Sequence, residues 1–218
     1  MDKLNLRIFS ATAKKPSDPI KLRQSLKDFG LSAHFEYENS RPLAQVYNEA
    51  IVEARDTGHE GLLLVHDDVW MEEDPGIKLK RLFEKWDVVG VAGCSRATVN
   101  SPALWNMMGA GNLHGAVAHS YGAIKHMTSF GPYPSDAVLI DGVFIALNRK
   151  ALESGVTFDE RCPSFFHFYD LLFSTRVRKR GLKLGVGDVT ITHDSPGLSQ
   201  ITEDWRVGEK YFFENVNA

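Results

Sequence analysis

The sequence predicts an α/β fold with a Rossmann-like, doubly wound and mostly parallel sheet. Candidate strands and helices alternate over the first 65 residues in the order β-α-β-α-β, which gives parallel strands joined by right-handed crossovers. The third strand, residues 62–65, is apolar throughout, as expected for a strand covered on both faces. With 218 residues, the chain is long enough for one well-filled α/β domain and a small appended lobe.

Two candidate strands precede the apolar one. The first covers residues 4–9, and the second covers residues 33–37 and ends in Glu38. The residues that follow the first strand are small enough to let a ligand approach the backbone. They are Ser10, Ala11 and Thr12.

Two amphipathic helices connect these strands. Ser17 or Asp18 is expected to cap the first helix, and Gly30 to end it. The second helix follows the polar run 39–42. The apolar faces consist of Leu22, Leu26 and Phe29 in the first helix and of Leu43, Val46, Tyr47, Ala50, Ile51 and Ala54 in the second.

Two adjacent carboxylates, Asp67 and Asp68, follow the apolar third strand. Both cannot point into the core, because an unpaired buried charge is too costly. We therefore expect them in the crevice at the carboxyl edge of the sheet, where α/β folds bind ligands. Hard oxygen ligands there suit Mg²⁺ or Mn²⁺ bridging the phosphates of a substrate. The alternative is a strand that runs into an acidic turn, since Asp is common where strands end.

The middle of the chain is harder to interpret. A helix over residues 75–86 and a strand over residues 88–92 are followed by a stretch from 94 to 136 without clear periodicity. A stretch of this length is usually functional or mobile. Its glycine-rich part, residues 109–115, is interpreted as a flexible loop. Three histidines at spacings of five and seven fit no metal-binding helix face, so we expect surface or internally bonded histidines at His114, His119 and His126.

Regular structure returns at residues 138–147 with an apolar strand that Asp141 and Gly142 interrupt. Such an interruption suggests a bulge or a close backbone approach beside a site. Asn148 is expected to cap a short helix. Asp170 lies in the first turn of a later helix, where the helix dipole favours the carboxylate form.

The last predicted strand, residues 189–191, leads to His193. The tail after it is rich in aromatic residues and is expected to pack back on the domain. Its aromatic residues are Trp205, Tyr211, Phe212 and Phe213.

Composition excludes several classes of protein. A net charge of −3 argues against a large nucleic-acid surface. Cys94 and Cys162 lie 68 positions apart, which excludes a thiolate zinc site and gives no sign of a disulfide framework, so a reducing cytoplasm fits best. The sequence has no signal peptide and no run of about 20 apolar residues, so membrane contact would have to be peripheral. Neither GxGxxG after the first strand nor a P-loop motif is present, so side chains and a metal would have to hold a nucleotide.

Three segments in a fixed order carry a resemblance to a known family. They are His66-Asp67-Asp68 after an apolar strand, Asp141-Gly-Val-Phe-Ile-Ala-Leu-Asn-Arg149, and His167-Phe-Tyr-Asp170-Leu-Leu-Phe-Ser leading to His193. In this order and spacing the sequence resembles family 2-like glycosyltransferases of the GT-A fold, from the first strand to about Gly197. The resemblance implies one domain over residues 1–218, with a nucleotide-binding half (1–95) and an acceptor-side half with the tail (96–218). It also implies a small antiparallel lobe on the acceptor side.

The resemblance implies a metal site at the DxD-type element. Asp68 would be a metal ligand, and Asp67 would contact the metal or the sugar nucleotide. His66 occupies the position of the first Asp of DxD, often a ribose or metal contact, so metal affinity is expected to be weaker. His193 matches the late histidine that completes such sites.

The remaining implied roles concern the two substrates. Asp170 falls where inverting members place the catalytic base, and its reference pKa of about 3.9 would leave it ionised but weakly basic at pH 7. Leu172 replaces an acidic residue that is common two positions later. Asp141 and Gly142 would line the pocket for the donor sugar and the acceptor. Nucleoside contacts are implied for Ser10, Ala11, Thr12 and Glu38, and Tyr47 and Asn48 would extend that wall.

The implied activity is a Mn²⁺- or Mg²⁺-dependent, inverting transfer of sugar from a UDP- or GDP-type donor to an unidentified hydroxyl acceptor. A degenerate protein that binds nucleotide and metal without turnover is the alternative, favoured by His66 and Leu172. A phosphohydrolase would require additional clustered carboxylates or histidines for a second metal, and the sequence does not offer them convincingly.

Overall fold

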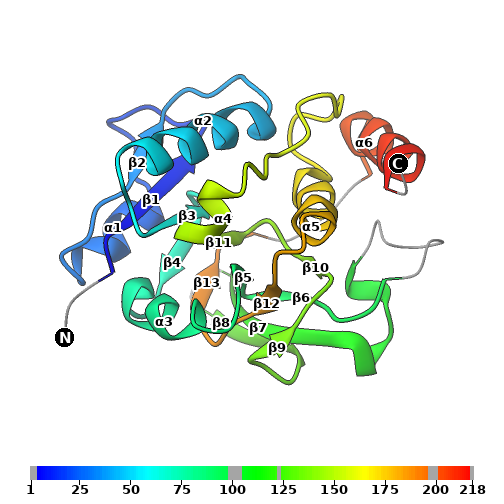
Figure 1. The fold of residues 1–218 in the computed structure, drawn as a ribbon. Helices are drawn as coiled ribbons and strands as arrows, with labels where there is room; N and C mark the ends of the chain where they lie inside the picture. Colours follow the sequence, from blue (N-terminus) through cyan, green and yellow to red (C-terminus); the bar gives the residue numbers. More distant parts are fainter. Residues whose placement is uncertain (1–3, 98–104, 122–123, 196–200, 217–218) are drawn as a thin grey trace.

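The computed structural model describes residues 4–97, 105–121, 124–195 and 201–216. Over these residues the chain forms a seven-stranded sheet, a six-stranded sheet and six α-helices (Figure 1). The two sheets share one core, which includes Ile8 and Val89 from the larger sheet and Val117 and Ile191 from the smaller. The α/β class that the sequence predicts is confirmed.

The first 65 residues follow the predicted β-α-β-α-β order. Strand β1 lies between β2 and β3 and pairs in parallel with both. All five residues of β3 are buried, which explains why this strand is apolar throughout. The elements are β1 (Leu6–Ala11), α1 (Lys21–Lys27), β2 (His34–Glu36), α2 (Leu43–Asp56) and β3 (Gly61–Val65).

The start of α1 differs from the prediction that Ser17 or Asp18 caps it. Ile20 is the N-cap residue, and no side chain hydrogen bond caps the helix. The Asp18 carboxylate instead accepts a hydrogen bond from the backbone N–H of Lys15, 2.8 Å away. Asp readily bonds to nearby backbone in this way, so its carboxylate closes the turn before the helix and is not available to cap it.

Beyond β3 the larger sheet becomes mixed, in the order β2-β1-β3-β11-β5-β12-β9. Strand β11 (Phe144–Asn148) runs antiparallel between β3 and β5 (Val88–Gly90). The edge is formed by β12 (Leu184–Val186), parallel to β5, and by β9 (Ser135–Asp136), antiparallel to β12. Residues of α2, α4 (Arg149–Glu153) and α5 (Tyr169–Lys179) pack together against one face of this sheet. The Asn148 side chain caps α4, as predicted.

The smaller sheet has the order β10-β6-β7-β13-β4, with β8 paired to β7. Two predicted strands are split between the sheets. Residues 88–92 divide into β5 and β6 around Val91, and residues 138–147 divide into β10 and β11. The remaining elements are β4 (Val69–Met71), α3 (Pro75–Leu82), β6 (Ala92–Cys94), η1 (Trp105–Met107), η2 (Ala110–Asn112), β7 (Leu113–Tyr121), β8 (Ile124–Gly131), β10 (Leu139–Ile140), β13 (Ile191–His193) and α6 (Glu203–Asn215).

The expectation that residues 94–136 lack regular structure is wrong, because β7 and β8 form an antiparallel hairpin there. Ile124 and Met127 on β8 are exposed, at 70% and 48%, so this strand lacks the alternation of buried and polar residues that would reveal it. Residues 98–104 and 122–123 of this stretch, like Gly197 at the end of the family resemblance, lie outside the described residues.

The tail packs back on the domain, as predicted. Trp205 and Phe212 of α6 are buried in the core. No helix in the described part of the chain is both long and apolar enough to cross a membrane.

The glycine-rich run 109–115 was predicted to be a flexible loop, but it contains η2 and the first residues of β7, including Gly115. Gly115 lies within β7 at φ +100°, and a Cβ there would stand 2.0 Å from the carbonyl oxygen of Val91. β6 and β7 can pair this closely only because residue 115 has no side chain.

We predict that Gly115→Ala destabilises the protein strongly. The positive φ and the overlap with Val91 together should cost about 3 kcal/mol or more, which corresponds to a fall in melting temperature of about 10 °C. Thermal denaturation followed by circular dichroism measures this. Gly111→Ala is the matched control, because a Cβ at Gly111 meets nothing within 4 Å. Equal melting temperatures for the two variants would contradict the packing argument.

Candidate functional site

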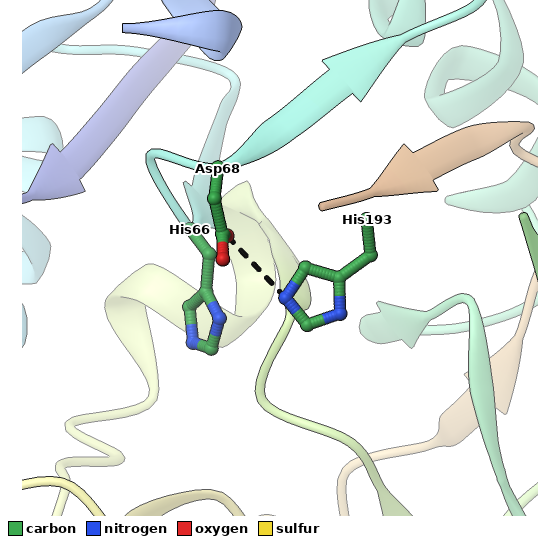
Figure 2. A group of neighbouring side chains, drawn as sticks. All are labelled: His66, Asp68 and His193. Carbon is green, nitrogen blue, oxygen red and sulfur yellow. Dashed lines mark ion pairs between the residues drawn. The ribbon is translucent and has the colours of Figure 1, made fainter. Parts of the chain in front are cut away.

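Three side chains that could bind a metal converge where β3 ends and β13 ends (Figure 2). Asp68 is followed directly by β4, and β4 pairs antiparallel with β13 so that His193 lies opposite Val69. The N–H of Asp194 donates to the carbonyl oxygen of Asp68, 3.1 Å away, and fixes this register. Ligand atoms of His66, Asp68 and His193 all lie within 4.8 Å of one another.

The chemistry of these groups fits a divalent cation. Oδ1 of Asp68 lies 3.3 Å from Nε2 of His193 in an ion pair, and it is buried without a hydrogen-bond partner among the described residues. The long contact to His193 leaves this buried carboxylate oxygen incompletely satisfied, and a cation would satisfy it. Two imidazoles and one carboxylate form a ligand set that suits Mn²⁺ better than Mg²⁺.

The pKa values of the two histidines shift in opposite directions. Burial lowers the pKa of His66, although Asp68 opposes the shift, so its ring is neutral at pH 7. Burial also opposes charge on His193, but the Asp68 carboxylate outweighs burial and raises the pKa of His193. The same contact lowers the pKa of Asp68 despite its own burial. Asp68 is therefore an anion at neutral pH and can act as a metal ligand.

Tyr169 orients the His66 ring. Its hydroxyl donates to the carbonyl oxygen of Gly142 at 3.1 Å and lies 2.8 Å from Nε2 of His66. Because the single hydroxyl proton goes to Gly142, we assign the proton of this second bond to Nε2 of His66. This tautomer leaves the lone pair of Nδ1 for a cation.

Asp67 lies beside the end of β1 and not in the metal-binding group. Its Oδ2 accepts a hydrogen bond from the Thr12 hydroxyl at 2.7 Å and lies 2.9 Å from the ammonium of Lys14. Ala11 ends β1 and is partly buried. Ser10 is fully buried, and its hydroxyl has no partner within the part of the chain that the structure describes.

Asp170 occupies the first turn of α5, as predicted, and its surroundings change its acidity. Burial and the nearby Asp141 raise the pKa of Asp170 to about 7, although hydrogen bonds from the N–H groups of Leu171 and Gly142 oppose the shift. The expectation of an ordinary pKa near 3.9 is therefore wrong. Desolvation and a like charge outweigh the helix dipole here. A carboxylate with this pKa is a much better proton acceptor at neutral pH.

Gly142 is required for this arrangement. Its N–H donates to Oδ2 of Asp170 at 2.8 Å, and a Cβ on it would lie 2.2 Å from the Tyr169 hydroxyl. The neighbouring Asp141 carboxylate accepts from the indole N–H of Trp105 at 3.1 Å. The predicted close backbone approach at this pair is confirmed.

Glu38 borders the Asp67 side of the site, because its N–H donates to the carbonyl oxygen of Lys14 at 3.0 Å. Glu38 is exposed, at φ 51°, after β2. Asn48 on α2 makes hydrogen bonds to the backbone N–H and carbonyl of Phe158, at 2.8 and 3.2 Å, and to the Glu160 carboxylate. Its amide therefore fastens the segment before α5.

Sequence reasoning missed four residues that border the site. Lys14 and Tyr169 contact predicted residues directly, and Trp105 bonds to Asp141 from a stretch without a periodic signal. His119 lies on β7 opposite His193 of β13, with 6.1 Å between the ring centroids. The histidine spacings fit no helix, but His119 belongs to a strand. Of these four, only Tyr169 could have been suspected from the sequence, because it is adjacent to Asp170.

Comparisons with known proteins agree with this geometry. A family model described as "Glycosyltransferase like family" matches residues 31–215. The streptomycin biosynthesis protein StrF of Streptomyces griseus is 27% identical over 185 residues. The match covers 80% of this chain but only 61% of StrF.

Solved structures share the fold at low sequence identity. A197 from STIV superposes with a TM-score of 0.53 and 13% identity, covering 91% of this chain and 98% of its own. GalNAc-T7, solved with UDP, GalNAc and Mn²⁺, gives 0.53 and 9%, covering 96% and 48%. The mannosyltransferase PcManGT from Pyrobaculum calidifontis, solved with GDP-Man and Mn²⁺, gives 0.50 and 12%, covering 91% and 59%. The GT-A-type fold is confirmed by these neighbours, and the family match over residues 31–215 shows that the chain belongs to the glycosyltransferase-like family.

Proposed function

We propose that this chain is a metal-dependent glycosyltransferase that transfers a sugar from a UDP- or GDP-type donor to a hydroxyl acceptor, with inversion at the anomeric carbon. The observation that carries the proposal is the convergence of a His-Asp-His group with a partly buried carboxylate of raised pKa in a chain of this family. Two structural neighbours were solved with Mn²⁺, one with UDP and one with GDP-Man, which supports this donor class.

In this proposal His66, Asp68 and His193 hold the cation, and Mn²⁺ or Mg²⁺ is the expected ion. When bound, the ion stabilises negative charge on the departing diphosphate. Lys14 would add positive charge at the same edge, because its ammonium already lies beside Asp67.

We place the nucleoside along the ends of β1 and β2, in the half formed by residues 1–95. Ala11, Thr12 and Glu38 are the proposed nucleoside contacts. Ser10 precedes them in β1 with a fully buried hydroxyl, so it would contact the nucleoside only if its neighbours moved. Asn48 would support this wall through its bonds to Phe158. The acceptor would lie in the half formed by residues 96–218, where Asp141 and Gly142 border Asp170.

Asp170 is the proposed catalytic base. As the acceptor oxygen forms its bond to the anomeric carbon and the bond from that carbon to the diphosphate breaks, the acceptor proton passes to the Asp170 carboxylate. With a pKa of about 7, Asp170 accepts this proton at neutral pH and remains ionised in a large fraction of molecules. A single base on the acceptor side, without an enzyme nucleophile, favours inversion.

A protein that binds nucleotide and metal without turnover is the second candidate. Leu172, two positions after the proposed base, is 3% exposed and packs in the core, so no acidic side chain supports the acceptor at that position. Nucleotide binding without transfer in both the natural protein and Asp170→Asn would favour this candidate.

We predict that Asp68→Asn weakens Mn²⁺-dependent binding of UDP or GDP about 100-fold, because the anionic ligand is lost. Isothermal titration calorimetry with and without Mn²⁺ measures this. Asp56→Asn is the control, because Asp56 is an exposed residue at the end of α2 paired with Arg55. Unchanged binding in Asp68→Asn would remove the metal assignment.

The second prediction concerns pH. Because Asp170 must be ionised to accept a proton, nucleotide release from UDP- and GDP-sugars should rise as pH increases through about 7 and be lost in Asp170→Asn. In Asp141→Asn the negative neighbour that raises the Asp170 pKa is gone, so the rise should move to lower pH by about one pH unit. Asp56→Asn should leave the profile in place. An unchanged profile in Asp141→Asn would show that the rate does not depend on this carboxylate pair.

A further inference from the structure

Two adjacent phenylalanines are exposed beside the candidate site. Phe165 and Phe166, in the segment just before α5, are 56% and 50% exposed. The Phe166 ring lies 5.4 Å from the His66 ring and 6.4 Å from the Tyr169 ring, measured between centroids. Phe166 therefore borders the site, while half of its surface remains open to solvent.

The backbone that carries these rings is held in place from two helices. The Asp204 carboxylate, in the first turn of α6, accepts hydrogen bonds from the N–H groups of Phe165 and Phe166 at 2.8 and 3.3 Å, and from the Ser164 hydroxyl at 2.8 Å. On the opposite side, the N–H of Leu43 in α2 donates to the carbonyl oxygen of Phe165 at 3.0 Å. Asp204 thus joins three donors of one short segment through charge-assisted bonds.

A hydrophobic core lies within reach of this segment, so the absence of one does not explain why Phe165 and Phe166 are exposed. Phe168, two positions after Phe166, is 4% exposed and packs against Trp205 and Phe212 of α6. Fixing a backbone costs conformational entropy at every ordered residue. A segment that is ordered at this cost while two phenylalanine rings face solvent presents a surface suited to a ligand with an apolar face.

We infer that Phe166 is a stacking surface for the ring of a sugar acceptor and that Asp204 is the positioning residue that holds Phe166 beside His66 and Tyr169. This inference rests on the proposed glycosyltransferase function. The face of a pyranose that carries C–H groups is slightly positive and packs on the negative face of an aromatic ring. Tyr169 and Asp170 both bond to the backbone of Gly142, at 3.1 and 2.8 Å, so an acceptor on Phe166 would bring its hydroxyl toward the proposed base.

The test measures sugar and nucleotide binding separately on the full chain. Methyl glycosides of glucose, galactose, mannose and N-acetylglucosamine are the acceptor probes, followed by saturation-transfer NMR in the presence of Mn²⁺ and UDP or GDP. At least one glycoside should bind the natural protein and bind about tenfold more weakly to Phe166→Ala and Asp204→Asn. Phe166→Tyr should retain binding, because the aromatic face remains. Calorimetric binding of the nucleotide should be equal in all variants.

Two controls separate stacking from general damage. Ile77→Ala removes an exposed apolar side chain from α3, and Glu203→Gln removes the exposed carboxylate next to Asp204. Both should bind glycosides as the natural protein does. Equal glycoside binding in Phe166→Ala, or no glycoside binding to a natural protein that binds Mn²⁺ and nucleotide, would overturn this inference alone. Loss of Mn²⁺-dependent nucleotide binding in the natural protein would overturn the proposed function and this inference with it. Should Asp204→Asn unfold in thermal denaturation, Phe166→Ala decides the outcome.

Discussion

The pairing of β4 with β13 is the interaction on which the site depends. β4 begins one residue after Asp68, so its antiparallel ladder with β13 brings His193 beside Asp68 although 125 positions separate them in sequence. The ladder belongs to the smaller sheet, whereas Asp68 leaves the larger sheet through β3. The metal-binding group therefore forms only when both sheets are complete. The Asp68–His193 ion pair at 3.3 Å is therefore held by the pairing of the two strands and not by residues close to each other in sequence.

The sequence predicts the first half of the fold well because its signals there are local. β3 is buried on both faces, and its four consecutive apolar residues say so directly. Prediction of the second half of the fold fails for physical reasons. Strands of two or three residues are too short to show alternation, and β8 exposes apolar residues. A continuous apolar run also does not reveal that the chain changes sheets at Val91.

The site shows the same division. Asp68 and His193 were expected to meet, and they do. Lys14 and Trp105 could not be found, because each acts through a partner far away in sequence, 53 positions for Lys14 and 36 for Trp105. The raised pKa of Asp170 could not be predicted from the sequence either, since it depends on burial and on Asp141, 29 positions earlier. The result is two carboxylates of opposite character within one site: a depressed pKa suits Asp68 to bind a cation, and a raised pKa suits Asp170 to accept a proton.

The way the chain crosses between its two sheets limits how the protein can move. Two of the crossings are short: the single buried residue Val91, and the segment 141–143, which is tied to the first by the hydrogen bond from Asp141 N–H to the Ala92 carbonyl at 2.9 Å. Neither of these crossings is long enough to act as a hinge, so the two sheets cannot separate there by a hinge motion. Any rearrangement on ligand binding is therefore expected in the loops around this seam, which itself carries Asp141 and Gly142.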